Sequence, residues 1–187
     1  MPVRDDEKAL VARLRAGDES AFREVVDAYR DRILTVIARV AGASADAEDL
    51  AQDAFLKAFG AIGRFDGRSA LFTWLYRIAI NTARDWHDHR RRRPTVPLYG
   101  ENGPLADPAA PDEGPEHAAI AREERAAVRR ALARLPEPFR TTLVLREMEG
   151  LAYEDIAEAL DVSIGTVESR IFRARCKLRV LLEEELP

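Results

Sequence analysis

The sequence predicts an all-α protein in which a flexible acidic linker joins two small helical domains. Apolar residues recur at steps of three and four along most of the 187 residues, the spacing of one buried helix face. No convincing alternation at a step of two, which would favour strands, is found. Residues 95–119 contain five prolines, three glycines and five acids but no lysine or arginine, which is typical of a linker. We therefore expect domains at 1–94 and 118–187 and a linker at 95–117.

Four helices are expected in the first domain, and their ends follow local signals. The first ends near Gly17 and the second, which is longer, ends near Gly42. The third starts near Asp46 and carries acids in its first turn, which suits the helix dipole. The fourth runs into the arginines at 90–93. In the second domain, helical spacing resumes near residue 120 and is interrupted by the prolines at 136 and 138.

The bulk composition is that of a globular protein, with 47% hydrophobic and 33% charged residues. A single cysteine, Cys176, excludes an internal disulfide and fits a reducing compartment. The N-terminus is charged, unlike a signal peptide, and no apolar run approaches the length that spans a bilayer. We expect a cytoplasmic protein without membrane insertion.

Positive charge is concentrated in two helices, although the net charge of the chain is −4. Residues 68–93 hold seven arginines and two aspartates, and residues 163–179 hold five basic residues and one acid. Residues 1–66, in contrast, carry 10 basic and 13 acidic residues. This pattern favours a protein that contacts polyanions in two places.

Residues 139–178 contain a helix, a short second helix at 153–160, a tight turn and a third helix capped by Ser163. This is the helix-turn-helix layout, whose second helix enters the DNA major groove, although an ordinary helical hairpin has the same spacing. The outer face of the last helix carries Ser169, Phe172 and Arg173. Arginine suits guanine, and an apolar ring can contact a thymine methyl. Insertion of this face into the DNA major groove explains why a phenylalanine stands among arginines.

The stretch LREMEGLAYEDIAEALDVSIGTVESRIFRARCKLR (145–179) resembles the C-terminal domain of extracytoplasmic-function (group IV) sigma factors of bacterial RNA polymerase. The resemblance implies that this domain recognises the −35 promoter element. Glu168 stands where many members carry a basic residue. The expected −35 contacts are Thr166, Ser169, Arg170, Phe172 and Arg173.

The stretch FDGRSALFTWLYRIAINTARDWHDHRRRRP (65–94) interleaves aromatic residues with arginines, a combination that suits stacking on unpaired bases and holding of the backbone. The alternative is that the aromatic residues form core and the arginines a solvated end. The stretch also resembles the part of a sigma factor that melts and binds the −10 element. The resemblance implies that Phe65 and Asn81 help to hold a flipped non-template base. It also implies that Trp74, Arg77 and Arg84 lie near the melted strand.

The stretch DAEDLAQDAFLKAF (46–59) is similar to the segment by which sigma factors dock on the clamp helices of the largest polymerase subunit. Composition alone indicates an acidic solvated face around a stripe of core residues. The resemblance further implies contact with the polymerase flap, with duplex and melted promoter DNA, and with an anti-sigma factor. The implied docking residues are Asp49, Leu50, Gln52, Asp53 and Phe55.

Two other functions compete with an alternative sigma factor. An ordinary helix-turn-helix regulator would need a receiver domain or ligand pocket, and the first domain supplies neither. A metal enzyme would rest on DWHDH, where Asp85 and His89 share a face but His87 points elsewhere and His117 lies in the linker. No catalytic motif appears, and we expect neither an enzyme nor a cofactor or metal.

Overall fold

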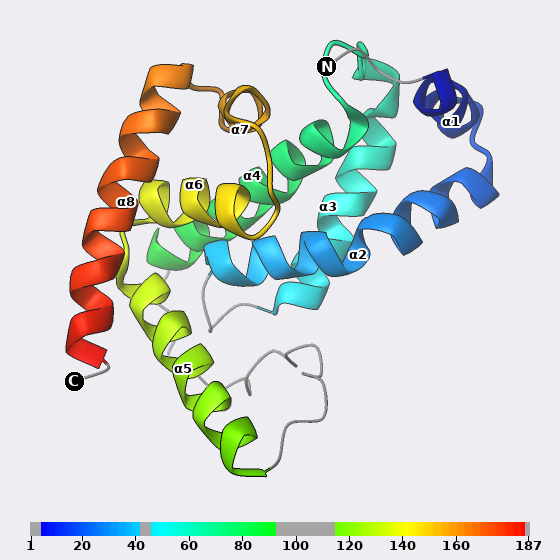
Figure 1. Cartoon of the computed structure of the whole chain (residues 1–187). Helices are drawn as coiled ribbons and strands as arrows, with labels where there is room; N and C mark the ends of the chain where they lie inside the picture. Colours follow the sequence, from blue (N-terminus) through cyan, green and yellow to red (C-terminus); the bar gives the residue numbers. More distant parts are fainter. Residues whose placement is uncertain (1–4, 42–45, 93–114, 186–187) are drawn as a thin grey trace.

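The computed structural model describes residues 5–41, 46–92 and 115–185, and these ranges contain helices and no strands (Figure 1). The predicted all-α class is confirmed. The expected linker falls mainly on residues 93–114, which lie outside the described residues. The helices are α1 (Asp5–Arg15), α2 (Glu19–Ala41), α3 (Ala47–Ala61), the 3-10 turn η1 (Ile62–Arg64), α4 (Leu71–Arg92), α5 (Pro115–Arg134), α6 (Glu137–Glu147), α7 (Tyr153–Leu160) and α8 (Ile164–Glu185).

In the first domain, α2, α3 and α4 pack against one another, and α1 packs against α2 and η1. Gly17 ends the α1 turn with a φ of 77°, a left-handed conformation that favours glycine. Asp46 caps α3, because its carboxylate accepts the N–H of Asp49 at 3.3 Å. The N–H of Leu71 at the start of α4 donates to the carboxylate of Glu7, so α1 caps α4.

In the second domain, α8 packs against α5, α6 and α7. The break expected at the prolines is confirmed, since α5 ends at Arg134 and α6 begins at Glu137. The start of α5 at Pro115 is three residues earlier than the domain boundary expected from the sequence. None of the described helices combines the length and apolar character needed to cross a bilayer.

The two domains pack against each other, which the linker composition did not indicate. Contacts join α4 to α7 and α2 to α6, and Figure 1 shows α6 and α7 lying over the first domain. One buried cluster runs through both domains, from Val36 and Ile80 to Leu145 and Ile156. A smaller cluster of Leu132, Leu135, Leu143 and Ala174 holds α5 and α6 to α8. The main core is therefore shared between the domains.

Candidate nucleic-acid interface

The helix-turn-helix predicted from the sequence is formed by α7 and α8. Asp161 lies between them in the left-handed region, with a φ of 54°, and the N–H of Val162 donates to the carbonyl of Ala157 at 3.0 Å. Ser163 caps α8, because its hydroxyl accepts the N–H of Thr166 at 3.2 Å. Val167, Ile171 and Ala174 form the buried side of α8. This packing fixes which face of α8 points outward.

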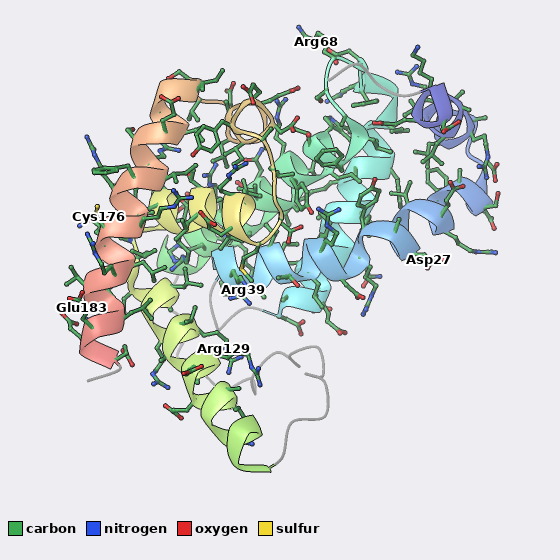
Figure 2. All side chains as sticks on the ribbon, viewed as in Figure 1. Asp27, Arg39, Arg68, Arg129, Cys176 and Glu183 are labelled. Atoms are coloured by element: carbon green, nitrogen blue, oxygen red, sulfur yellow. The ribbon has the colours of Figure 1, made fainter. Side chains whose placement is uncertain are left out.

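The outward face of α8 carries the three side chains that the sequence placed there. Phe172 is 70% exposed, and Ser169 and Arg173 are also exposed. Arg170 and Thr166 are half-buried at the edges of this face. Figure 2 shows Cys176 on the outer side of α8, and Cys176 follows Phe172 by four residues, about one helical turn. A large apolar ring in water is unfavourable unless a partner covers it.

One arginine of α8 is tied to the neighbouring helix. The Nε of Arg175 donates to the carboxylate of Glu147 on α6 at 3.1 Å, and this contact raises the pKa of Arg175. Arg173 is exposed on the outward face of α8. Arg173 and Arg175 therefore lie on different sides of the helix.

The acidic helix α3 divides the five expected docking residues into two groups. Asp49, Gln52 and Asp53 are exposed, whereas Leu50 and Phe55 are only 6% and 7% exposed. The ring of Phe55 lies 5.9 Å from that of Phe59, within the core. Leu50 and Phe55 therefore support the helix from beneath and are not surface contacts in this structure.

Sequence reasoning missed the apolar residue on the exposed side of α3. Leu56 is 63% exposed, and it follows Gln52 and Asp53 by four and three residues, so the three share a face. The signal was available in that spacing. A leucine flanked by acidic and amide side chains provides a surface for a protein partner with basic and apolar groups.

The expected −10 residues in and before α4 differ in their exposure to solvent. Phe65 is buried, with its ring 5.3 Å from that of Trp74, and its carbonyl accepts a hydrogen bond from Arg15. Trp74 is half-buried and Asn81 is exposed. The structure thus brings Phe65 and Trp74 together, with the Phe65 ring closed from solvent.

Both arginines of the expected −10 set point at the second domain. The Nε and Nη2 of Arg77 donate to the carbonyl of Glu158 on α7 at 3.1 and 2.5 Å, and the Glu158 carboxylate lies 3.6 Å away. The Nε of Arg84 donates to the carboxylate of Glu137 on α6 at 2.9 Å. These two arginines are therefore engaged by acidic residues of the other domain.

A buried carboxylate from the second domain lies between two side chains of the first. Glu149, whose side chain is 5% exposed, accepts hydrogen bonds from the Tyr76 hydroxyl at 2.5 Å and the Arg32 Nε at 2.9 Å. Burial and this hydrogen bond to Glu149 raise the pKa of Tyr76 far above its usual range. The Arg32 guanidinium also lies 5.8 Å from the centre of the Tyr76 ring.

A second link is made by Arg140, a buried residue of α6. Its Nη2 donates to the carbonyl of Val40 at the end of α2 at 2.9 Å, and its Nη1 donates to the carbonyl of Ala133 at 3.0 Å. Burial lowers the pKa of Arg140. Its partners are 100 and 7 residues away, so no local pattern signals the role.

Comparison with known proteins identifies both domains. Residues 25–93 match the family model described as sigma-70 region 2, and residues 125–178 match the model described as sigma-70, region 4. The two regions in this order define the sigma-70 class of transcription initiation factors. Each domain of the structure thus corresponds to one of these regions.

Full-length relatives narrow the class further. The chain is 45% identical to the RNA polymerase sigma-H factor of Pseudomonas aeruginosa, over 94% of this chain and 93% of the relative. It is 39% identical to the ECF RNA polymerase sigma-E factor of Escherichia coli K12, over 90% of each chain. The chain therefore belongs to the extracytoplasmic-function (ECF) sigma factors. It directs transcription initiation and is not an enzyme.

Two solved structures are similar over both domains. CnrH, solved in complex with the cytosolic domain of CnrY, matches 96% of this chain and 99% of its own, with a TM-score of 0.70 and 30% identity. The sigma factor RpoE of Bartonella quintana, solved with the anti-sigma factor NepR, matches 87% of this chain and 96% of its own. Its TM-score is 0.69 and its identity 25%.

Proposed function

We propose that three separate surfaces of this ECF sigma factor divide the work of initiation. The exposed face of α3 docks on the clamp helices of core RNA polymerase, α4 holds the melted −10 strand, and α8 reads the −35 duplex. The second domain also contacts the polymerase flap. The exposure of Phe172 carries this proposal, because the ring lies beside Ser169 and Arg173 on the free side of a helix-turn-helix.

The −35 surface combines two kinds of base contact. Arg173 can donate two hydrogen bonds to guanine, and Phe172 can cover a thymine methyl group. Thr166 and Arg170 lie at the edges of the same face, where a hydroxyl and a guanidinium reach phosphates. Glu168 is exposed beside Ser169 and would repel a phosphate, which restricts how α8 can lie in the groove.

The docking surface consists of Asp49, Gln52 and Asp53, with Leu56 added from the structure. Acidic groups around one apolar side chain suit a partner with complementary basic groups, which gives specificity and speeds association. Leu50 and Phe55 contribute by holding α3 in place, since they are buried beneath this surface.

The −10 surface consists of Trp74, Arg77, Asn81 and Arg84 on one length of α4, with Phe65 behind it. An indole and an amide can hold an unpaired base while guanidinium groups hold its phosphates. We further propose that an anti-sigma factor binds this chain in the cytoplasm, because the similar sigma factor RpoE was solved with the anti-sigma factor NepR.

The proposal is tested by reconstitution. The chain is mixed with core RNA polymerase, the complex is isolated by size exclusion, and run-off transcription is measured on a library of upstream fragments from the source genome. We expect a stable complex that initiates at promoters sharing −35 and −10 elements. Specific DNA binding by the chain without polymerase, and no transcript with it, would instead indicate an ordinary helix-turn-helix regulator.

A further inference from the structure

The contact between the two domains covers part of the surface that we assign to the −10 strand. The side chains of Arg77 and Arg84 are 38% and 30% exposed, whereas Arg68, which precedes α4 and is paired only locally with Asp66, is 85% exposed. The groups that engage the two arginines are a carbonyl and carboxylates, which accept hydrogen bonds through oxygen as the phosphates of a nucleic-acid backbone do. A DNA strand would have to displace them.

The covering groups are themselves ordered by their own domain. The carboxylate of Glu137 that faces Arg84 also accepts the hydroxyl of Thr141, one turn along α6, at 2.8 Å. The carbonyl of Glu158 is fixed by its place in the last turn of α7. The second domain therefore presents preformed acceptors to α4, which reduces the entropy lost on pairing.

Glu149 closes the contact at its other end. Its carboxylate is buried between Tyr76 and Arg32, both from the first domain, and it comes from the turn between α6 and α7. Because α6 and α7 both leave this turn, holding Glu149 holds the two helices that cover Arg84 and Arg77. We call the group of Glu149, Tyr76 and Arg32 the latch.

We propose that the free chain is autoinhibited, with the second domain acting as an internal competitor of the −10 strand and the latch keeping it in place. The inference rests on the assignment of α4 to the −10 strand. In this closed state the −35 face of α8 and the docking face of α3 stay exposed. Inhibition is therefore selective: strand binding by α4 is suppressed, whereas duplex binding by α8 is not.

Opening the latch should raise the apparent affinity of the full chain for a single strand. A ligand that binds only the open state is weakened by the fraction of open molecules, so raising that fraction tenfold strengthens binding about tenfold. Two variants open the latch from opposite sides, Glu149→Ala and Arg32→Ala. Glu154→Ala, an exposed acid on α7, is the control that removes the same charge from the same domain.

The Arg32→Ala variant separates the latch from simple electrostatics. It removes a positive charge, so charge alone predicts weaker DNA binding. Autoinhibition predicts the opposite sign. Opening of the latch therefore predicts that both latch variants bind the single strand more tightly and that Glu154→Ala binds it as wild type does. Charge alone does not predict this result.

The assay uses the full chain and a fluorescein-labelled single strand carrying the non-template −10 sequence of a promoter mapped by run-off transcription, read by anisotropy. Domain separation is followed by spin-label distances between native Cys176 and Ala28→Cys, an exposed position on α2. We expect about tenfold tighter strand binding by both latch variants, together with longer and broader label distances. Affinity for a −35 duplex should stay at the wild-type value.

Two outcomes overturn the inference: latch variants that stay closed, and variants that open without tighter strand binding. Circular dichroism and complex formation with core polymerase verify that each variant folds. Wild-type holoenzyme is the reference that separates this inference from the proposed function. If holoenzyme fails to bind the −10 strand, the assignment of α4 is wrong; if it binds while the free variants equal wild type, only autoinhibition is wrong.

Discussion

Replacing Phe172 by alanine should damage promoter binding and leave the fold intact. Phenylalanine presents about 200 Å², so a residue that is 70% exposed leaves about 140 Å² open to water. At about 25 cal/mol per Å², covering all of it would contribute about 3.5 kcal/mol. A thymine methyl covers about a third of that area, so we expect a loss of about 1 kcal/mol, roughly fivefold in promoter affinity.

The neighbouring Ile171 is the matched control, because it lies one residue away on the same helix and is 2% exposed. Ile171→Ala should lower the free energy of unfolding by about 2–5 kcal/mol, since it opens a cavity in the core. Phe172→Ala should change it by less than about 1 kcal/mol. Urea unfolding of both variants measures this contrast.

The base partner of Phe172 is found with DNA in which deoxyuridine replaces each thymine of the −35 element in turn, which removes one methyl group. At the contacted position, deoxyuridine should weaken holoenzyme binding to wild type as much as Phe172→Ala does. It should not weaken binding to the variant any further, because the interaction is already lost. Additive losses at every thymine, or wild-type binding by Phe172→Ala, would refute the assignment.

Three further predictions test the other surfaces. Arg173→Ala and Ser169→Ala should each remove a base contact that contributes about 1–3 kcal/mol to promoter binding. Run-off transcription from the cognate promoter should fall accordingly, while pull-down of core polymerase is unchanged. Asp53→Arg should weaken complex formation with core polymerase, whereas Asp27→Arg, on the exposed side of α2 (Figure 2), should not; equal affinities would remove α3 as the docking site. The free chain should bind its promoter weakly and with strong salt dependence, because 13 acids against 10 basic residues in its first 66 positions repel phosphates; nanomolar binding at physiological salt would contradict this.

The helix-turn-helix could be predicted from the sequence because its signals are local. Ser163 at the start of α8 and the apolar spacing of Val167 and Ile171 lie within one helix and its cap. The same spacing fixed the outward direction of Phe172, which the structure confirms. Such local signals predict the buried and exposed faces of a helix because residues three or four apart share a face, whatever the helix packs against.

The docking helix shows how a resemblance can override the local pattern. The resemblance places Phe55 on the docking surface, although its spacing from Leu50, Ala51 and Ala54 predicts that it lies on the buried stripe of α3. The structure follows the spacing. The spacing also places Leu56 on the exposed face, but an isolated leucine on a surface is common and does not by itself indicate a contact.

The contact between the two domains could not be predicted from the sequence, because its partners are far apart along the chain. Glu149 and Tyr76 are 73 residues apart, and Arg140 is 100 residues from its partner Val40. No periodicity links positions at such separations, and the composition of the intervening linker favours independent domains. The charge pattern predicts that Arg77 and Arg84, on a basic helix, are open to DNA. In the folded chain they instead pair with Glu158 and Glu137 of the second domain.

Charge and packing lead to the same order of events at a promoter. The exposed acids of α3 favour a protein partner with basic groups over DNA, so polymerase is the partner that this surface attracts first. The exposed basic face of α8 can then reach duplex DNA without rearrangement. Arg77 and Arg84 of α4 are paired with the second domain, and the proposed autoinhibition frees them only when the domains part. Because a single strand exists only after melting, the surface that is covered in the free chain is the one whose ligand forms last.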